Sequence, residues 1–466
     1  MPAIDERRLT RNRLHDTFSG EAIQSASVRG DPIMTFAGST SGKPARKRPI
    51  LAITAAAFFA SMLPAQAEKL TIWGGWPEME PFYKRVGEQL KKKYPDLEVS
   101  VELIALREHE KRNALALPSG AAADVIEMEV EATRYLEGGL VPAAPDNVVK
   151  FVKDGKHFDK FFQDSVTFED KIYGVPLFRG QTALYYNTDM YAKAGLSGAP
   201  KTMEDYTPYA EKLTQRDAQG KPTVSGWSLR LSGGGQGVAE KFWINLFQFG
   251  GNLLEEKDGK WKAAFANEAG RKAFKQYVEN VQVLKTVSPE MKADAEAFEL
   301  EQTAMFIRES WVIGDIAKKS PNLKYATAPL PRGSIVIPVN LYVPTKPGKK
   351  ADLAWEYVLQ ANEPENLQWL LDNIGWLPNR KDVDYSAIIA KTPAFGAFVN
   401  FPSDYKFFSL PAIAPASEIL TRVAARLVDG YTNPKLQSDA AIDAFLKEAA
   451  AEVDTILKRE GLLATP

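Results

Sequence analysis

Strand-like and helix-like patterns alternate along residues 69–137, and this alternation constrains the fold more than any other feature of the chain. Short apolar and alternating runs predict strands, and apolar residues four apart, such as Phe82, Val86 and Leu90, predict a helix. Strands are expected at 69–73, 98–103 and 124–128, and helices at 80–94, 107–117 and 131–137. Strands alternating with helices imply a parallel sheet covered on both faces. The first part of the chain is therefore predicted to be an α/β unit.

The second half of the chain repeats this pattern. It predicts a strand at 227–230, a helix at 238–249 and another strand at 304–307. In open α/β sheets, ligands bind beyond the carboxyl ends of the strands. We therefore expect functional residues where these strands end, which is where residues 73–76, 127–131 and 308–311 lie.

The N-terminal region has the pattern of a secretory signal peptide. A basic cluster at 46–48 precedes an apolar run at 50–63, which Ala65-Gln66-Ala67 follows as a cleavage site. The run has 14 residues, fewer than the ~18 to 20 that span a bilayer, so a membrane anchor is the less favoured alternative. We predict that residues 1–67 are a leader, with its start at Met1 or Met34, and that the mature chain begins near Glu68 in the periplasm.

The amino-acid composition further narrows the class of protein to which the chain can belong. The chain has no cysteine, which excludes disulfides, thiolate metal sites and a lipid anchor on a cysteine at the cleavage point. Residues 68–466 are too many for one hydrophobic core and suit two lobes. The full chain has a formal net charge of −1 and the part after the leader is mildly acidic, which argues against nucleic acid as a partner.

Residues 173–206 carry the most specific order of motifs in the chain. They begin as a turn into an extended segment, after which residues 183–186, Ala-Leu-Tyr-Tyr, predict a buried strand. Asn187 is expected to stop this strand and a short helix at 190–194 to follow. This order resembles the hinge-strand region of the extracellular solute-binding proteins that serve ABC importers, in particular the carbohydrate-binding branch related to maltose-binding protein.

The resemblance implies a fold and a partner. The fold would be the type II periplasmic binding protein fold: two α/β lobes, each a mostly parallel sheet flanked by helices, with a hinge between them. It places residues 68–180 and 335–362 in the N-terminal lobe, and 181–334 and 363–466 in the C-terminal lobe. It also implies a monomer that closes around its ligand and delivers it to the membrane permease subunits of an ABC importer.

The sequence lacks the signatures of common enzymes. Beyond the leader its histidines are His109 and His157, which do not form a zinc-binding pair. The nucleophile motif G-x-S-x-G does not occur, and the S-x-x-K match at 403–406 is too short to indicate a catalytic serine. The glycine-rich run at 232–237 lacks the Gly-Lys-Ser/Thr of a phosphate loop. We predict no catalytic residue, no metal and no cofactor.

Three glutamates, Glu127, Glu129 and Glu131, alternate at the end of the third expected strand and would share one face if the strand continued. Carboxylates two residues apart on a strand lie side by side, ~6.5 to 7 Å apart at the backbone, which does not place them on opposite faces of a sugar ring. They suit accepting hydrogen bonds from hydroxyl groups; alternatively, they stabilise the start of the next helix. In the resembling family the position of Glu129 is commonly an aspartate near the ligand.

Tryptophans beside polar residues are the stronger signal for a saccharide. The apolar face of a pyranose stacks on an indole, while its hydroxyl groups need polar partners in a cleft that excludes water. Trp311 matches a family position at which tryptophan stacks on sugar. By their sequence patterns Trp243 and Trp355 are assigned to the core and Trp261 to the surface. The predicted ligand-binding set is Trp73, Trp76, Glu129, Arg179, Trp227, Arg230, Trp311, Asn340, Trp376 and Arg380.

Taken with the resemblance, which implies the importer, these observations predict the periplasmic substrate-binding component of an ABC sugar importer, which binds a mono- or oligosaccharide between its lobes. The alternative is a secreted carbohydrate-active hydrolase or lyase, which would need two ionisable groups with separated pKa values facing each other across the cleft. Tryptophan abundance favours a sugar over a polyamine or iron. Arg179, Arg230, Arg308 and Arg380 leave an acidic sugar open as the ligand.

Overall fold

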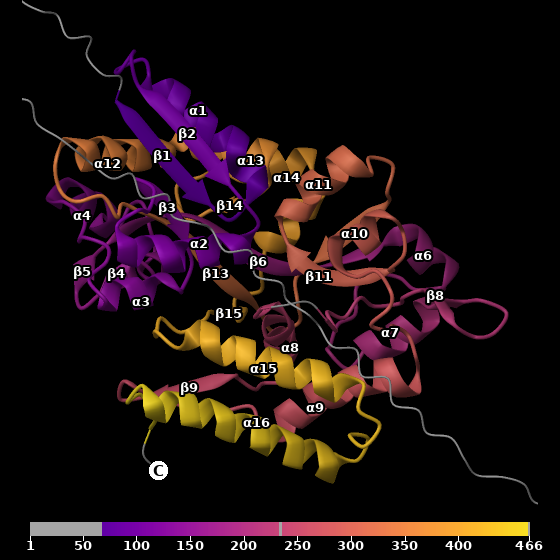
Figure 1. Cartoon of the computed structure of the whole chain (residues 1–466). Coiled ribbons are helices and arrows are strands. Elements are labelled where there is room, and N and C mark those ends of the chain that lie inside the picture. Colours follow the sequence, from indigo (N-terminus) through magenta and orange to yellow (C-terminus); the bar gives the residue numbers. More distant parts are fainter. Residues whose placement is uncertain (1–67, 233–234, 465–466) are drawn as a thin grey trace, which may run out of the picture. The chain divides into compact units, whose positions relative to one another are not determined.

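The computed structural model of the chain describes residues 68–232 and 235–464 (Figure 1). The predicted leader at 1–67, with its cleavage site and its two candidate starts, lies outside these residues. Within them, no helix combines the length and the apolar character needed to cross a membrane.

A nine-stranded sheet and three two-stranded hairpins make up the β structure of the described residues. The sheet contains β1 (Lys69–Gly74), β2 (Glu98–Leu103), β3 (Val125–Met128), β6 (Gly174–Asn187), β11 (Met305–Glu309), β12 (Tyr325–Ala328), β13 (Gly333–Tyr342), β14 (Leu377–Pro378) and β15 (Lys406–Phe408). The hairpins pair β4 (Thr167–Phe168) with β5 (Lys171–Ile172), β7 (Gln215–Arg216) with β8 (Pro222–Val224), and β9 (Leu254–Lys257) with β10 (Lys260–Ala263).

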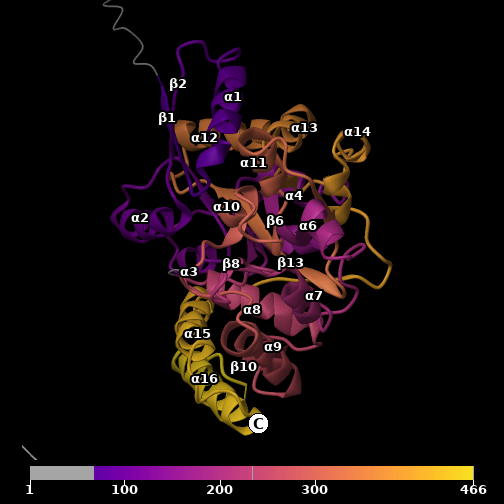
Figure 2. The same ribbon diagram turned by 90° about the vertical axis from the view of Figure 1, so that its right-hand side faces the viewer.

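Helices pack around this sheet from both halves of the chain. They are α1 (Glu80–Leu90), α2 (Leu106–Ser119), α3 (Ala132–Glu137), α4 (Asp146–Lys153), α5 (Lys160–Asp164), α6 (Thr188–Lys193), α7 (Tyr206–Leu213), α8 (Gly237–Gln248), α9 (Glu268–Val278), α10 (Asp294–Glu299), α11 (Trp311–Lys319), α12 (Lys349–Ala361), α13 (Pro364–Asn373), α14 (Ser386–Lys391), α15 (Ala416–Tyr431) and α16 (Asp439–Arg459). Helix α12 packs against α1 although the two are far apart in sequence, and α15 lies alongside α16 in both ribbon views (Figures 1 and 2).

The strands of the first α/β unit pair as the sequence predicts, but the sheet as a whole is mixed. Strands β2 and β3 both run parallel to β1. Strand β13 is antiparallel to β3, and β6 is antiparallel to β11, β12, β13 and β14. The expectation of mostly parallel sheets is therefore met around β1 and in the pairing of β13 with β15, but not along β6. The alternation rule describes strands joined through helices, whereas β6 and β13 are long strands that pair with each other across the sequence.

Strands β6 and β13 each pass from one hydrophobic core to another. Along β6, Val175, Leu177 and Phe178 belong to a first core, and Leu184 belongs to a second. Along β13, Ile335 packs in the second core, while its neighbour Val336 packs in the first. The first and second cores are thus connected by adjacent, hydrogen-bonded strands.

Each hydrophobic core contains residues from separate parts of the sequence. The first core contains residues from 70–178 and 336–376, and the second contains residues from 184–335 and 408–457. A third, smaller core draws on 183–185, 295–316 and 371–398. Leu367 and Leu370 of α13 pack in the first core, although the sequence assigns this helix to the C-terminal lobe. The lobe boundaries themselves stay a prediction.

Two expected elements differ from the structure. Residues 227–230 do not form a strand, because only the Ser228 N–H reaches β11, donating to the Met305 carbonyl at 2.9 Å, before the chain turns away. Helix α1 ends at Leu90 rather than at residue 94, and residues 91–93 continue as a turn ahead of Pro95.

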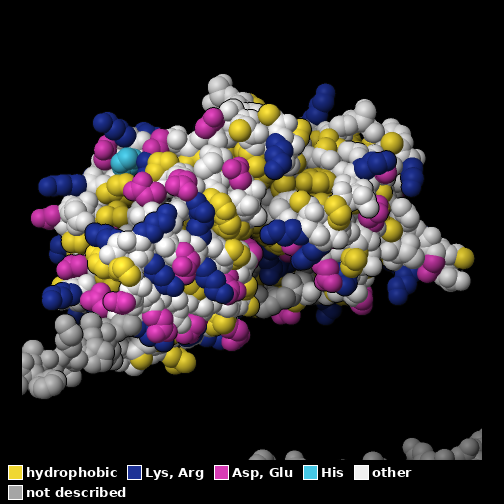
Figure 3. All heavy atoms as spheres, turned by 90° about the horizontal axis from the view of Figure 1, so that it is seen from above, with side chains coloured by type: hydrophobic (Ala, Val, Ile, Leu, Met, Phe, Trp, Pro, Cys, Tyr) yellow, Lys and Arg dark blue, Asp and Glu magenta, His cyan; other side chains and the backbone are white. Residues whose placement is uncertain are grey.

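On the face seen in Figure 3, lysine and arginine side chains are interspersed with aspartate and glutamate, so that this face has no large patch of one sign.

Candidate functional site

A cavity of about 410 Å³ lies between elements of the first core and elements of the second and third. Part of its wall comes from the loop after β1, from α2 and from the end of β3. The facing part comes from α8 and from the junction of β11 and α11. Its lining residues are Trp76, Glu78, Ala105, Leu106, Arg107, Glu108, Glu129, Gly180, Arg230, Glu240, Arg308, Glu309, Trp311, Ile337, Val339 and Trp376.

Three tryptophans form a continuous aromatic cluster on this cavity. The ring centroids of Trp76 and Trp376 are 6.4 Å apart at an interplanar angle of 82°, and those of Trp311 and Trp376 are 6.4 Å apart at 37°. Trp76 and Trp376 are buried, whereas Trp311 is only half-buried. The polar edges of two of these rings are anchored, because the Trp376 Nε1–H donates to Glu78 at 3.1 Å and the Trp311 Nε1–H to Glu309 at 3.4 Å. The apolar ring faces are therefore held in fixed orientations beside polar groups.

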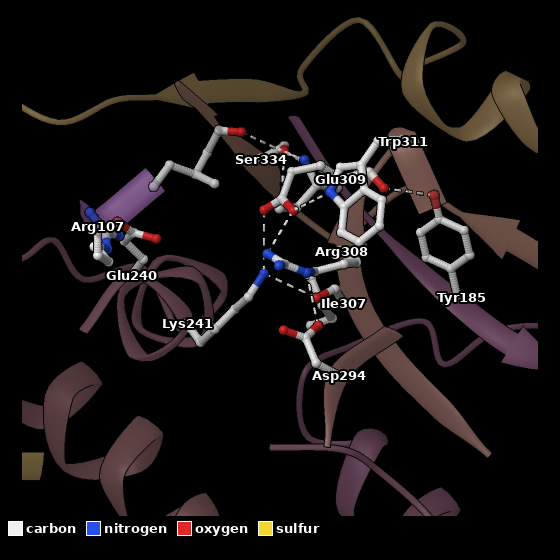
Figure 4. A network of polar contacts seen from close by, with 12 residues as sticks. Arg107, Tyr185, Glu240, Lys241, Asp294, Ile307, Arg308, Glu309, Trp311 and Ser334 are labelled. Carbon is white, nitrogen blue, oxygen red and sulfur yellow. Dashed lines mark hydrogen bonds and ion pairs between the residues drawn. The ribbon is translucent and has the colours of Figure 1, made fainter. Parts of the chain in front are cut away.

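A buried ion network supports the Trp311 side of the cavity (Figure 4). The Arg308 guanidinium pairs with Glu309 at 2.7 Å and with Asp294 at 2.8 Å, and the Lys241 ammonium lies 3.5 Å from Glu309. Burial alone would raise the pKa of Glu309, but the charges of Arg308 and Lys241 outweigh it and lower this pKa to about 2. Glu309 is therefore an ionised carboxylate that holds the Trp311 indole in place.

Glu129 lies on the other side of the cavity, where several carboxylates are close to one another. Its side chain is buried, and its pKa is raised well above the ordinary value by burial and then by the negative charges of Glu131 and Glu240. The pKa of Glu131 is raised to about 7, by burial and then by Glu110. The two walls of the cavity thus differ, because the Glu309 carboxylate is compensated by cations, whereas Glu129 lies among several carboxylates with Arg107 as a nearby cation.

Glu127 does not share the cavity with Glu129. It is fully buried, accepts hydrogen bonds from the Tyr83 hydroxyl and from the Gly75 N–H at 2.9 Å, and has its pKa raised to about 8 by burial. Of the three alternating glutamates, Glu127 ties the loop after β1 to α1, while Glu129 lines the 410 Å³ cavity.

The structure brings half of the predicted ligand set to one cavity. These five residues are Trp76, Glu129, Arg230, Trp311 and Trp376. The others, Trp73, Arg179, Trp227, Asn340 and Arg380, lie outside its lining.

Trp73, Arg179 and Trp227 each have other contacts. The Trp73 Nε1–H donates to Glu102 at 3.1 Å, and the Arg112 guanidinium covers its ring at 4.0 Å. Arg179 donates to the carbonyl of Pro378 and, at 3.1 Å, to Gln181. Trp227 is 1 % exposed and packs on Tyr206 in the second core.

Asn340 and Arg380 are buried in polar networks of their own. Asn340 donates to the Ser165 carbonyl and the Tyr342 hydroxyl at 3.3 Å each, and it lines a second cavity of about 180 Å³, which shares Glu129 with the larger one. That cavity also contains Pro338, whereas Ile337 and Val339 face the larger one, so the two cavities contact alternate residues of β13. Arg380 pairs with Asp382 and donates to the Asn362 carbonyl at 2.7 Å.

Sequence reasoning missed several lining residues, among them Glu78, Arg107 and Glu240. Glu78 follows Trp76 and Pro77 just beyond the end of β1, so its place after a strand could have identified it. Arg107 and Glu240 lie near the first turns of α2 and α8, and their meeting at 3.8 Å depends on how the two cores face each other. No pattern in the amino-acid sequence predicts that contact.

Comparison with known proteins identifies a family and agrees with the fold. The family model described as bacterial extracellular solute-binding protein matches residues 86–397. A lactose-binding protein of Rhizobium radiobacter is 26 % identical over 365 residues, which cover 75 % of this chain and 79 % of the relative. A putative binding protein of Brucella abortus is 22 % identical over 416 residues, covering 86 % of this chain and 95 % of the relative.

Solved structures resemble most of the chain. An ABC transporter solute-binding protein of Thermotoga lettingae, bound to α-D-tagatose, is 23 % identical with a TM-score of 0.70, and the match covers 84 % of this chain and 100 % of that one. A maltose-bound protein of T. maritima is 20 % identical with a TM-score of 0.69, covering 84 % and 100 %. These likenesses confirm the predicted fold class, the type II periplasmic binding protein fold.

Proposed function

The chain belongs to the family of bacterial extracellular solute-binding proteins, and we propose from this premise that it binds a mono- or oligosaccharide in the 410 Å³ cavity. The relatives include proteins named for lactose and maltodextrin binding, and structural neighbours carry tagatose and maltose. The cavity has a volume within the ~300 to 1,000 Å³ that is usual for small-molecule sites.

The aromatic cluster is the observation that carries this proposal. Trp76, Trp311 and Trp376 present indole surfaces to the cavity, and a pyranose offers matching C–H faces. Arg230 and Glu129 line the same space and can donate to and accept from sugar hydroxyl groups. A buried hydroxyl group without a partner costs about 1–3 kcal/mol, so polar groups on both walls would select among sugars.

The same geometry suggests how the protein would act in transport. The cavity walls belong to different cores, and β6 and β13 connect these cores. A saccharide that contacts both walls favours the closed arrangement, because it binds that arrangement more tightly than an open one. We propose that the closed monomer docks on the permease of an ABC importer in the periplasm.

The alternative function, a hydrolase or lyase, would need a free carboxylate to act as a base or nucleophile. Glu309 and Glu129 line one cavity and their pKa values are shifted in opposite directions. Glu309, however, is engaged by Arg308, Lys241 and the Trp311 N–H. The binding function is therefore the better supported of the two.

A thermal-shift screen tests the proposal. The purified protein would be heated with lactose, maltose, maltodextrin, mannobiose, tagatose, glucuronate and galacturonate, each at the same excess. We expect one class of saccharide to raise the melting temperature clearly, since a ligand at a hundredfold excess over its Kd adds about 2.7 kcal/mol of stability. Chromatography of the saccharide after incubation should show no product. A flat response across the panel would contradict saccharide binding, and product formation would favour the enzyme.

A further inference from the structure

A cluster of three carboxylates adjoins the saccharide cavity at the end of β3. Glu129 and Glu131 follow this strand directly, and Glu110 projects from α2. Each offers a carboxylate oxygen, and these three oxygens all lie within 4.8 Å of one another. Glu129 and Glu131 are 8 % and 7 % exposed, so that water can do little to screen their charges.

The positive charge beside this cluster is too small to balance it. Arg107 pairs with Glu110 and lies 3.8 Å from Glu240 on α8, and it also attracts Glu129. One guanidinium thus faces three clustered carboxylates and a fourth nearby. When the three are ionised, the cluster with Arg107 has an excess of two negative charges. Buried charges require a compensating partner, and a doubly charged cation would match this excess.

Two buried oxygen atoms at the cluster also lack a partner. Neither Glu131 Oε1 nor Gln236 Oε1 accepts a hydrogen bond from any residue that the structure describes. Gln236 is 2 % exposed, directly precedes α8, and places its amide nitrogen 3.5 Å from Glu110 Oε1. It approaches the carboxylates from the second-core side, because the adjoining Val238 and Ala239 of α8 belong to that core. Buried acceptors are normally satisfied, so these two point to a missing electropositive group.

We propose that Glu110, Glu129 and Glu131 bind one divalent cation of the calcium type, and that the Gln236 amide turns over so that its oxygen, in place of its nitrogen, faces the carboxylates and becomes a further ligand. Carboxylate and amide oxygens in an irregular arrangement are the ligands that Ca²⁺ accepts, whereas zinc sites use histidine or cysteine. The cation links an element of the second core to two elements of the first, and it adjoins the saccharide cavity through Glu129. It is therefore a clamp between the two walls. This site goes beyond the proposed saccharide function and does not depend on it.

Calorimetric titration of CaCl₂ into the EDTA-treated and dialysed protein, without any saccharide, tests the proposal. We expect one Ca²⁺ per chain and a higher melting temperature in excess CaCl₂. Glu131→Gln should weaken Ca²⁺ binding at least tenfold, and so should Glu110→Gln, whose side chain is more exposed and easier to replace. Glu137→Gln, an exposed residue at the end of α3, is the matched control and should bind as the unmodified protein does.

The same variants distinguish a cation site from carboxylates that simply hold protons. In EDTA, Glu131→Gln should melt at a higher temperature than the unmodified protein, because one repelling charge is gone, yet it should not respond to CaCl₂. No binding of Ca²⁺ by the unmodified protein would overturn the proposal. A Ca²⁺ response of Glu131→Gln and Glu110→Gln equal to that of Glu137→Gln would overturn it as well. Either result would leave saccharide binding unaffected.

Discussion

Replacing Trp311 with alanine should remove much of the saccharide affinity while leaving the protein folded. Trp311 begins α11, is half-buried, and has its Nε1–H on Glu309 and its ring beside Trp376. Arg308 lies over the ring at 5.4 Å. The side chain is thus held in place by groups that remain in the variant, and the change removes mainly the surface that it offers to the cavity.

The size of the effect follows from the area of one indole face. A tryptophan buries about 150–250 Å² in all, so one face that a sugar covers amounts to roughly 60–80 Å². At about 25 cal/mol per Å² this area contributes about 1.5–2 kcal/mol. This loss corresponds to a Kd that is about 10- to 30-fold weaker.

Isothermal titration with the saccharide that gives the largest thermal shift measures this change. Urea unfolding of the same variant should show a loss of only about 1–2 kcal/mol, because Trp311 is packed on the edge of two cores rather than inside one. Trp261→Ala, a half-buried tryptophan on β10 away from the cavity lining, is the control and should bind normally. Unchanged affinity in Trp311→Ala, or equal losses in both variants, would refute the stacking role.

Three further predictions concern stability. The pKa of Glu309 is about 2 in the folded protein against an ordinary 4.5, so its ionised form contributes up to about 3 kcal/mol of stability above pH 4.5, which is lost as the pH falls towards 2. Urea unfolding between pH 5 and pH 3 should therefore show a shallower decline of the unfolding free energy in Glu309→Gln than in the unmodified protein. Parallel declines in the two proteins would contradict this. Gly226→Ala should cost about 1–3 kcal/mol because a Cβ there would lie 1.8 Å from the Ala210 carbonyl oxygen; an unchanged melting temperature would show that the backbone can yield. Leu184→Ala on β6, where the side chain is fully buried, should cost about 2–5 kcal/mol in urea unfolding, and a loss below 1 kcal/mol would contradict its place in the core.

Local patterns were sufficient to predict the first α/β unit. Strand β2 was predicted at its observed bounds, and the parallel pairing of β1 with β2 and β3 followed from the alternation rule. The antiparallel pairing of β6 with β13 could not be predicted in this way, because it joins segments more than 100 residues apart. Trp227 was expected on a strand near the ligand, but Gly226 packs directly against Ala210 and turns the chain into the second core.

The candidate site was predictable where it depends on strand ends. Trp76 and Glu129 follow β1 and β3, and Trp311 follows β11, so the rule for ligand sites in α/β sheets identified them. Asn340 and Arg380 have the right chemistry but are engaged elsewhere, by Tyr342 and by Asp382. Which polar side chain remains available to a ligand depends on its neighbours in space, and no single sequence contains that information.

A crystal structure of the protein with its best-stabilising saccharide tests the central claim most directly. The account predicts a sugar ring in the 410 Å³ cavity, with one apolar face on Trp311 or Trp376 and hydroxyl groups within hydrogen-bond distance of Glu129 or Arg230. A saccharide bound at another surface, with these indoles left uncovered, would contradict the account.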